Sequence, residues 1–125
     1  MSGTETEVPE TTPARKLSWE DAKCDLTQEY KINRKVSKGE YELVYKDMTG
    51  DEFETFTLSV RAQHSRNGVI DEKGFNTDFQ RKLRKRIIVS VMGKKYEELD
   101  DRNMQPWLLQ DLNDFIIQYI QGNVK

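Results

Sequence analysis

The strongest structural signal in the chain lies between Asn103 and Gln121, which reads Asn-Met-Gln-Pro-Trp-Leu-Leu-Gln-Asp-Leu-Asn-Asp-Phe-Ile-Ile-Gln-Tyr-Ile-Gln. Its apolar side chains recur at spacings of three and four residues, the pattern of a helix with one buried face. Pro106 suits a first helical turn, where its missing N–H would be unpaired anyway, and Gly122 suits the left-handed residue that ends a helix. The sequence therefore predicts a helix over 104–121. The residues of its apolar face are Leu108, Leu112, Phe115, Ile116, Tyr119 and Ile120.

Length and composition are those of one small domain. The chain has 125 residues, of which 34% are charged, so we expect a modest core. No apolar run approaches the roughly 18 residues that span a bilayer, and the N-terminus lacks the basic-then-apolar pattern of a signal peptide. Cys24 is the single cysteine and cannot form an internal disulfide. These features predict a cytoplasmic protein without a membrane span, in the host cytoplasm if the protein is viral.

The net charge of -2 is unevenly distributed along the chain. Residues 1–30 and 96–125 each carry a net charge of -4, residues 31–61 balance, and residues 62–95 carry +6. Such a dipolar chain suits self-association into a homo-oligomer or a charged protein partner. It suits a dedicated nucleic-acid binder less well, because those proteins are usually basic overall.

The first third of the chain predicts a tail, a short helix and strands. Residues 1–16 are rich in Ser, Thr, Glu and Pro, and we predict a disordered tail ahead of a single domain over 17–125. Ser18 can cap a helix with Asp21 three residues later, although the residues up to 30 fit a strand equally well. Residues 30–36 suggest a short, charged strand. From Glu40 to Lys46 apolar and charged residues alternate, which predicts a half-buried strand.

A second strand is predicted from Thr55 to Arg61, after a turn at 47–51. In this interpretation it forms a hairpin with 40–46 and turns Phe56, Leu58 and Val60 inward. Residues 62–76 have few apolar side chains and are predicted as a loop. The alternative for that segment is a small hairpin turned by the Asn-Gly pair at 67–68.

The next element is predicted as a helix over 77–92, capped by Thr77 with Gln80 three residues later. The competing interpretation ends the helix at Arg86 and continues as a strand over 87–91, whose β-branched residues favour extension. Residues 94–102 are a charged connector from which Tyr96 and Leu99 could enter the core. The predicted fold class is α+β: a small antiparallel sheet packed by two or three helices.

The densest charge run lies between residues 80 and 86. On a helix its cations would spread over the face that the apolar residues leave free, and they could bind phosphates along a nucleic-acid backbone. No aromatic residue lies among them to stack on bases, so a solvated helix face is the simpler interpretation. The candidate nucleic-acid-binding residues are Arg81, Lys82, Arg84, Lys85 and Arg86.

No catalytic or metal site is predicted. The only histidine, His64, has no nucleophile elbow or oxyanion loop to accompany it and is interpreted as an exposed loop residue. His64 and Cys24 are too few to form a metal-ligand cluster. The acidic pairs at 97–98 and 100–101 lack the spacing of a calcium loop. We therefore expect a protein that is not an enzyme and needs no cofactor.

Apolar residues outside the main helical face are the candidate partner-binding residues, because aromatic and methionine side chains are enriched in protein interfaces. The alternative is that they belong to the core, since single exposed apolar residues are ordinary. These candidates are Met92, Met104, Trp107 and Ile117.

The order of elements over residues 36–121 resembles that of phage tail assembly chaperones. The resemblance is carried by Gly-Glu-Tyr-Glu-Leu at 39–43, by Asp-Met-Thr-Gly-Asp at 47–51, and by Ile-Ile-Val-Ser-Val-Met-Gly-Lys at 87–94 before an acidic linker and an apolar terminal helix. It implies a non-enzymatic factor that holds virion structural proteins, a tape-measure protein and a tail-tube subunit, until assembly. We therefore expect a protein-interaction or assembly factor, and a nucleic-acid-associated regulator acting through 80–86 is the alternative.

Overall fold

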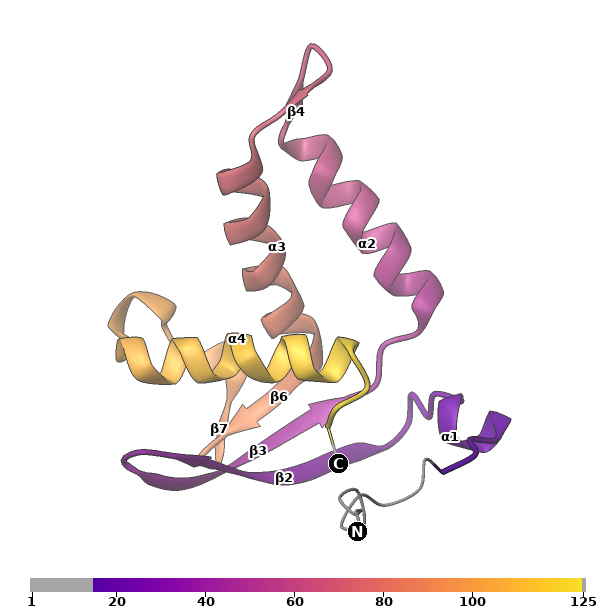
Figure 1. Cartoon of the computed structure of the whole chain (residues 1–125). Coiled ribbons are helices and arrows are strands. Elements are labelled where there is room, and N and C mark those ends of the chain that lie inside the picture. The colour runs from indigo at the N-terminus through magenta and orange to yellow at the C-terminus, as the bar shows by residue number, and fades with distance from the viewer. Residues whose placement is uncertain (1–14, 125) are drawn as a thin grey trace, which may run out of the picture.

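A computed structural model describes residues 15–124 and shows an α+β fold (Figure 1). The predicted disordered tail, 1–16, lies almost wholly outside the described residues. The molecule has two regions, which we call the base and the arm. The base consists of a four-stranded sheet with helix α4 lying across one face. The arm consists of helices α2 and α3 and the small hairpin that joins them, and it projects away from the base.

The sheet of the base is antiparallel throughout. Its strands are β2 (Glu29–Val36), β3 (Gly39–Lys46), β6 (Ile88–Val91) and β7 (Lys94–Lys95), in that spatial order. Strands β2 and β3 pair along their whole length, from Glu29 opposite Lys46 to Val36 opposite Gly39. The strands predicted at 30–36 and 40–46 are therefore confirmed, and their partners are each other and β6.

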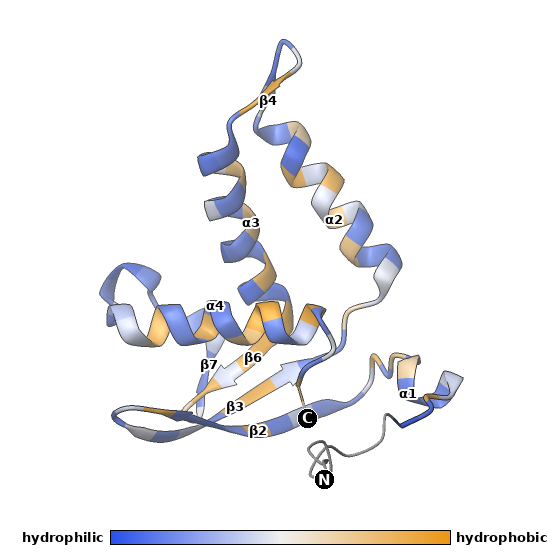
Figure 2. Cartoon of the chain, in the orientation of Figure 1, coloured by the Kyte–Doolittle hydropathy of each residue, from blue (hydrophilic) through white to orange (hydrophobic). Residues whose placement is uncertain are grey.

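Helix α4 (Pro106–Ile120) confirms the predicted terminal helix, with Pro106 in its first turn and Gly122 at a φ of 77° just beyond its end. Leu112 and Phe115 are fully buried, as are Leu43 of β3 and Ile87 at the end of α3. Apolar residues gather where α4 lies over β3 and β6, whereas β2 is mostly hydrophilic (Figure 2). The core of the base therefore lies between α4 and the middle of the sheet.

The strand predicted over Thr55–Arg61 is wrong, because this segment belongs to helix α2 (Gly50–Gln63). The Thr49 hydroxyl accepts a hydrogen bond from the Glu52 N–H at 3.0 Å and caps the helix. Residues 56 and 60 lie four apart and share a face in a helix as well as in a strand, whereas Leu58 shares that face only in a strand. Leu58 decides the matter, because its side chain is 63% exposed.

The arm turns back through β4 (Ser65–Arg66) and β5 (Val69–Ile70), which form the Asn67-Gly68 hairpin that was the alternative to a loop. Both turn residues have positive φ, 55° and 78°, as the tight turn requires. Helix α3 (Glu72–Ile87) is capped by Asp71, whose carboxylate accepts a hydrogen bond from the Gly74 N–H at 3.1 Å. The predicted start at Thr77 was therefore too late by one and a half turns.

The long helix predicted over 77–92 is wrong at its C-terminus as well. Helix α3 ends at Ile87 and β6 follows directly, as the competing interpretation proposed. The β-branched run at 87–91 favours an extended chain, and pairing with β3 supplies the backbone partners of a strand. Met92 and Gly93 then turn the chain into β7.

The remaining segments are short. Helix α1 (Trp19–Ala22) is a single turn in which the Asp21 carboxylate accepts from the Ser18 N–H at 2.8 Å, as predicted. Its Trp19 side chain is 70% exposed, so no apolar face is buried there. The connector after β7 contains η1 (Tyr96–Glu98) and η2 (Asp101–Asn103), and Tyr96 is buried as anticipated. Within residues 15–124, every helix is too short or too polar to cross a membrane.

Candidate functional site

A small groove lies at the end of the base where two turns and the first turn of α4 meet. It has a volume of about 270 Å³. We call it the end groove and define it by Val36, Tyr41, Met92 and Trp107. Each apolar wall comes from a different element, because Val36 ends β2, Tyr41 lies in β3, Met92 follows β6 and Trp107 begins α4. The groove is also lined by Lys38 of the β2–β3 turn and by Glu40 and Glu42 of β3.

The wall of the end groove is rigidly built. The Tyr41 and Trp107 rings meet edge to face with their centroids 6.5 Å apart. Tyr41 is only 6% exposed, and its hydroxyl donates to the Asp111 carboxylate one helical turn beyond Trp107. The Tyr41 side chain therefore holds the start of α4 against β3.

Asp111 is the centre of a largely buried ion pair that joins α4 to the sheet. Arg34 of β2 donates two hydrogen bonds to its carboxylate, at 2.8 and 3.0 Å, and a third to Gln118 at 2.7 Å. Burial acts to raise the pKa of Asp111, but the hydrogen bonds from Arg34 and Tyr41 and the Arg34 charge outweigh it, so the pKa is lowered. Burial and the hydrogen bond to Asp111 raise the pKa of Tyr41. The pair is therefore ionised at neutral pH beside a neutral tyrosine.

Met92 adopts an unfavourable backbone conformation at the rim. Its φ of 55° is left-handed, and Gly93 follows with a φ of 82°. Two positive φ values in succession suit a tight hairpin turn, for which Asn-Gly is the preferred sequence and a long side chain at the first position is unfavourable. The Met92 N–H donates to the Glu42 carbonyl at 2.9 Å, which holds the turn against β3. The Met92 side chain remains 50% exposed.

Two of the four predicted partner-binding residues come together in the end groove, Met92 and Trp107. Met104 is partly buried against the core of the base, and Ile117 is 46% exposed on α4 but does not line the groove. Sequence analysis missed the contribution of Val36 and Tyr41 to this site. The strand pattern did place Tyr41 on the buried face, but nothing local shows that the two turns meet.

The basic run at 80–86 is less exposed than predicted. Arg84 is buried, with only 5% of its surface accessible, so the expectation that it points to solvent is wrong. Its guanidinium donates to the Tyr96 hydroxyl at 3.0 Å, to Asn113 of α4 at 2.6 Å and to the Asp101 carboxylate at 2.9 Å. A buried cation needs such partners, and these three also fasten the acidic connector and α4 to the arm.

Arg86 is also engaged within the fold. Its guanidinium pairs with the Glu52 carboxylate at the start of α2 and donates to the Asp47 carbonyl at 3.0 Å. Arg81 and Lys82 pair with Asp78 one turn earlier on α3, at 3.9 and 3.4 Å. Of the five cations of the run, Lys85 alone makes no ion pair within residues 15–124.

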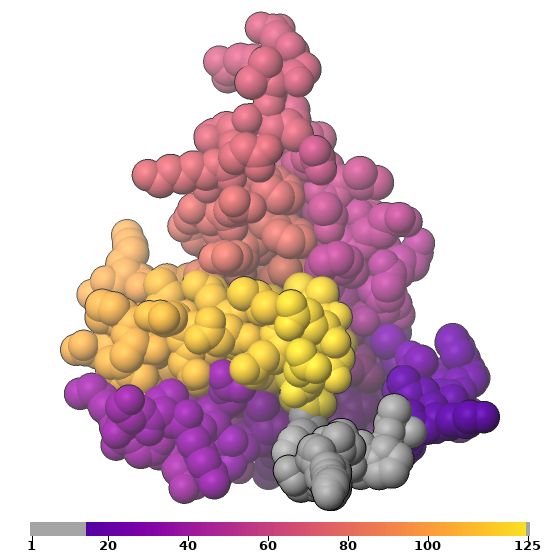
Figure 3. Space-filling model, in the orientation of Figure 1, coloured from indigo at the N-terminus to yellow at the C-terminus, as the bar shows by residue number. Residues whose placement is uncertain are grey.

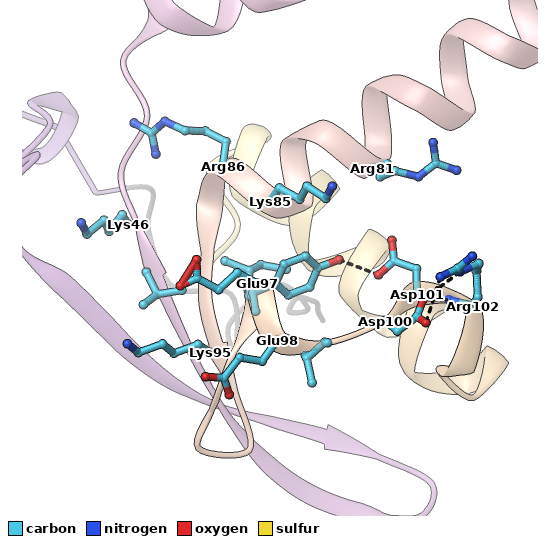
Figure 4. A pocket seen from close by; sticks show the side chains of 14 residues that line it. Lys46, Arg81, Lys85, Arg86, Lys95, Glu97, Glu98, Asp100, Asp101 and Arg102 are labelled. Carbon is cyan, nitrogen blue, oxygen red and sulfur yellow. Dashed lines mark hydrogen bonds and ion pairs between the residues drawn. The ribbon is translucent and has the colours of Figure 1, made fainter.

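A wider hollow of about 940 Å³ lies between the C-terminal half of α3 and the connector after β7 (Figure 4). Arg81, Lys85 and Arg86 project along one side of it from α3, and Glu97 and Glu98 lie on the opposite side. Cations and carboxylates are therefore mixed around one opening. Such a hollow has no strong field of one sign with which to draw in a polyanion.

The remaining candidate residues have structural partners. His64 is partly buried at the end of α2, where its Nε2 lies 3.1 Å from Asp78 Oδ2, so the exposed-loop interpretation is wrong. The Cys24 thiol donates to the Met48 carbonyl, and burial raises its pKa. Among residues 15–124, no group of three or more His, Cys, Asp or Glu side chains is placed to hold a metal ion. No family model, no curated protein and no solved structure matches this chain.

Proposed function

We propose that the protein is a non-enzymatic interaction or assembly factor of the cytoplasm that binds another protein through the end groove. The observation that carries the proposal is Met92, a half-exposed methionine held in a left-handed turn beside Trp107. An unfavourable backbone conformation at an exposed apolar residue is the kind of local strain that gathers at binding sites. Methionine adapts its shape to different apolar surfaces, which suits a partner-binding position.

The size of the end groove indicates what it accepts. Pockets for drug-sized ligands start at roughly 300 Å³, and the end groove is slightly smaller. It therefore suits one or two apolar side chains of a partner protein. The resemblance to phage tail assembly chaperones would make the partner a virion structural protein, and we include that partner class in the proposal.

The test is Met92→Asn. Asparagine tolerates positive φ, so the variant should unfold at the same or a higher denaturant concentration than the wild type, a gain of up to about 1 kcal/mol. The same change removes the apolar side chain from the groove, so partner binding should weaken by about tenfold or more. Proteins retained from an extract of the native cell are identified, purified and titrated against both forms. Ile117→Ser, which alters an exposed apolar residue outside the groove, is the matched control and should bind as the wild type does.

Loss of partner binding together with retained stability would support the proposal, because a damaged fold would lower both. Equal binding by wild type and Met92→Asn would place the partner elsewhere on the molecule. A retained protein that responds equally to Met92→Asn and Ile117→Ser would also contradict the proposal.

Nucleic-acid association through the basic run is the second candidate, and one observation favours it. Lys46, Lys85 and Lys95 all line the hollow of Figure 4, and within residues 15–124 none of the three makes an ion pair. Binding to mixed-sequence DNA or RNA should then fall steeply with salt and be lost in a Lys46→Glu, Lys85→Glu double variant. Arg84 is excluded from this test because it is buried. If neither DNA nor RNA binds at physiological salt, protein binding through the end groove is the one candidate function that remains.

A further inference from the structure

Within residues 15–124, no strand pairs with the outer edge of strand β2. β2 is an edge strand of the sheet, and its eight residues pair only with β3 among residues 15–124. An open edge presents a row of N–H and C=O groups that another strand can use. Proteins often protect such an edge with lysines, and β2 carries Lys31 and Lys35. The arrangement of these charges shows what β2 can pair with.

The two faces of β2 differ. Tyr30, Ile32, Arg34 and Val36 are partly buried, and Arg34 reaches α4, whereas the alternate residues are exposed on the other face. If two copies join edge to edge about a twofold axis perpendicular to the sheet, the strands run antiparallel and α4 lies on the same side in both. Each residue must then face a residue of its own face, because side chains alternate along a strand. Only registers that satisfy this condition are compatible with the fold. The exposed residues are Glu29, Lys31, Asn33 and Lys35.

The charges on β2 distinguish among the registers centred on Lys31, Ile32 and Asn33. With Ile32 on the twofold axis, Glu29 faces Lys35 of the second copy, Tyr30 faces Arg34 and Lys31 faces the neutral Asn33. A shift that places Lys31 on the axis sets Lys31 against itself, and a shift that places Asn33 on the axis sets Lys31 against Lys35 twice. Like charges directly opposite each other destabilise a strand pair, whereas opposite charges stabilise it.

We propose that two copies of this chain pair through their β2 strands in the register with Ile32 on the axis, which makes one continuous sheet of both bases. Two Glu29–Lys35 ion pairs and two Tyr30–Arg34 contacts flank the central isoleucines. The paired stretch runs from Glu29 to Lys35 of each copy, so each base gains hydrogen-bond partners along most of its open edge. This surface is separate from the end groove, because of the β2 residues only Val36 lines the groove.

Charge substitutions test the proposal through the mass of the protein in solution, measured by sedimentation or light scattering over a range of concentrations. The wild type should be a dimer. Lys35→Glu sets two glutamates against each other on both sides of the axis and should weaken dimerisation by about tenfold. Lys31→Glu is the matched control: it makes the same charge change on the same exposed face but faces Asn33, so the dimer should persist.

The double variant Glu29→Lys, Lys35→Glu restores the ion pair with exchanged charges and should recover the dimer. Within one chain, Glu29 lies opposite Lys46 and Lys35 lies opposite Glu40. The double variant leaves both of these pairs with like charges, so recovery cannot come from repair of the hairpin itself. Circular dichroism of every variant establishes that the chain is folded.

Cysteine cross-linking in a Cys24→Ser background determines the register. Lys31→Cys and Asn33→Cys proteins should form a disulfide-linked dimer when mixed, because residues 31 and 33 face each other across the axis. Neither should cross-link rapidly alone. Self-linking of the Lys31→Cys protein, or of the Asn33→Cys protein, would show a neighbouring register and overturn the one proposed. A wild type that stays monomeric at all concentrations would overturn the proposed dimer. Met92→Asn should still dimerise, so the dimer and the protein-binding role of the end groove are tested independently.

Discussion

The base and the arm bury their apolar residues to different extents. Leu112 and Phe115 of the base are inaccessible to solvent, whereas the four phenylalanines of the arm all remain partly exposed. The space-filling view shows the reason, because the broad base narrows into an arm only as wide as its paired helices (Figure 3). A helix that lies on a sheet is covered by several strands, whereas α2 of the arm packs mainly against α3, and α3 also contacts α4 and the sheet. The phenylalanines of the arm are Phe53, Phe56, Phe75 and Phe79.

Polar contacts, in contrast, join the two regions tightly. Arg84 and Arg86 lie in the last turns of α3 and reach α4, the connector and the Asp47 carbonyl just after β3. The Arg84–Asp101 ion pair therefore anchors the arm to the base, and contacts among the four phenylalanines, which we call the aromatic seam, stabilise the arm along its length. Substitutions at the junction of arm and base, in the core of the base and in the aromatic seam should therefore change the free energy of unfolding by different amounts.

The largest effect is expected from Arg84→Ala. It leaves Asp101 without its buried partner and removes the link between α3 and α4, which should cost about 3–5 kcal/mol of unfolding free energy. Chemical denaturation followed by circular dichroism measures the loss. Arg81→Ala, on the exposed face of the same helix, is the control and should cost less than about 1 kcal/mol. Similar values for both would mean that the buried link does not anchor the arm.

Leu112→Ala probes the base. The side chain is fully buried between α4 and the sheet, so its truncation should cost about 2–5 kcal/mol. Ile117→Ala alters an exposed residue on the same helix and should cost much less. Denaturation midpoints compare the two directly. A shift for Leu112→Ala worth under about 1 kcal/mol would contradict the burial that the base requires.

Phe79→Ala probes the seam of the arm. Its ring contacts Phe75, Phe53 and Phe56, with centroid distances of 5.2, 5.9 and 6.1 Å. Because the ring is partly exposed, the cost should be smaller, about 1–3 kcal/mol. Hydrogen exchange should show faster opening in α2 and α3 while α4 keeps its protection. Equal loss of protection in both regions would show that base and arm unfold as one unit.

The smallest expected effect is a change in stability as the pH falls. The pKa of Asp78 in the arm is lowered chiefly by its hydrogen bond with His64, and the pKa of Asp111 in the base is lowered against its burial by Arg34 and Tyr41. A carboxyl with a lowered pKa stabilises the fold above its ordinary pKa of about 4, and this contribution is lost as the pH falls through the folded value. The destabilisation caused by Asp111→Asn or Asp78→Asn should therefore be full at neutral pH and shrink below about pH 4. Denaturation at neutral and acidic pH checks this, and a constant difference would contradict it.

Local spacing along the chain was enough to predict several elements. The terminal helix follows from apolar residues at spacings of three and four, and β3 follows from alternation between Glu40 and Lys46. Both elements have one continuous buried face, so periodicity and burial agree. The strand predicted over Thr55–Arg61 is wrong because its β-branched and aromatic residues, two apart, fit a strand. The Thr49 cap and the spacing of residues 53, 56 and 60 fit a helix equally well.

Sequence patterns predict the α+β class, the strands β2 and β3 and the helix α4, because each depends on the order of apolar and polar residues within one short window. The burial of Arg84 and the formation of the end groove depend on the tertiary structure. It buried Arg84 by supplying Asp101 and Asn113, 17 and 29 residues further along the chain, and it brought Met92 to Trp107 by folding two turns onto one helix. A cation on a helix looks the same in sequence whether it meets solvent or a carboxylate, because its burial depends on partners that only the packed fold brings to it.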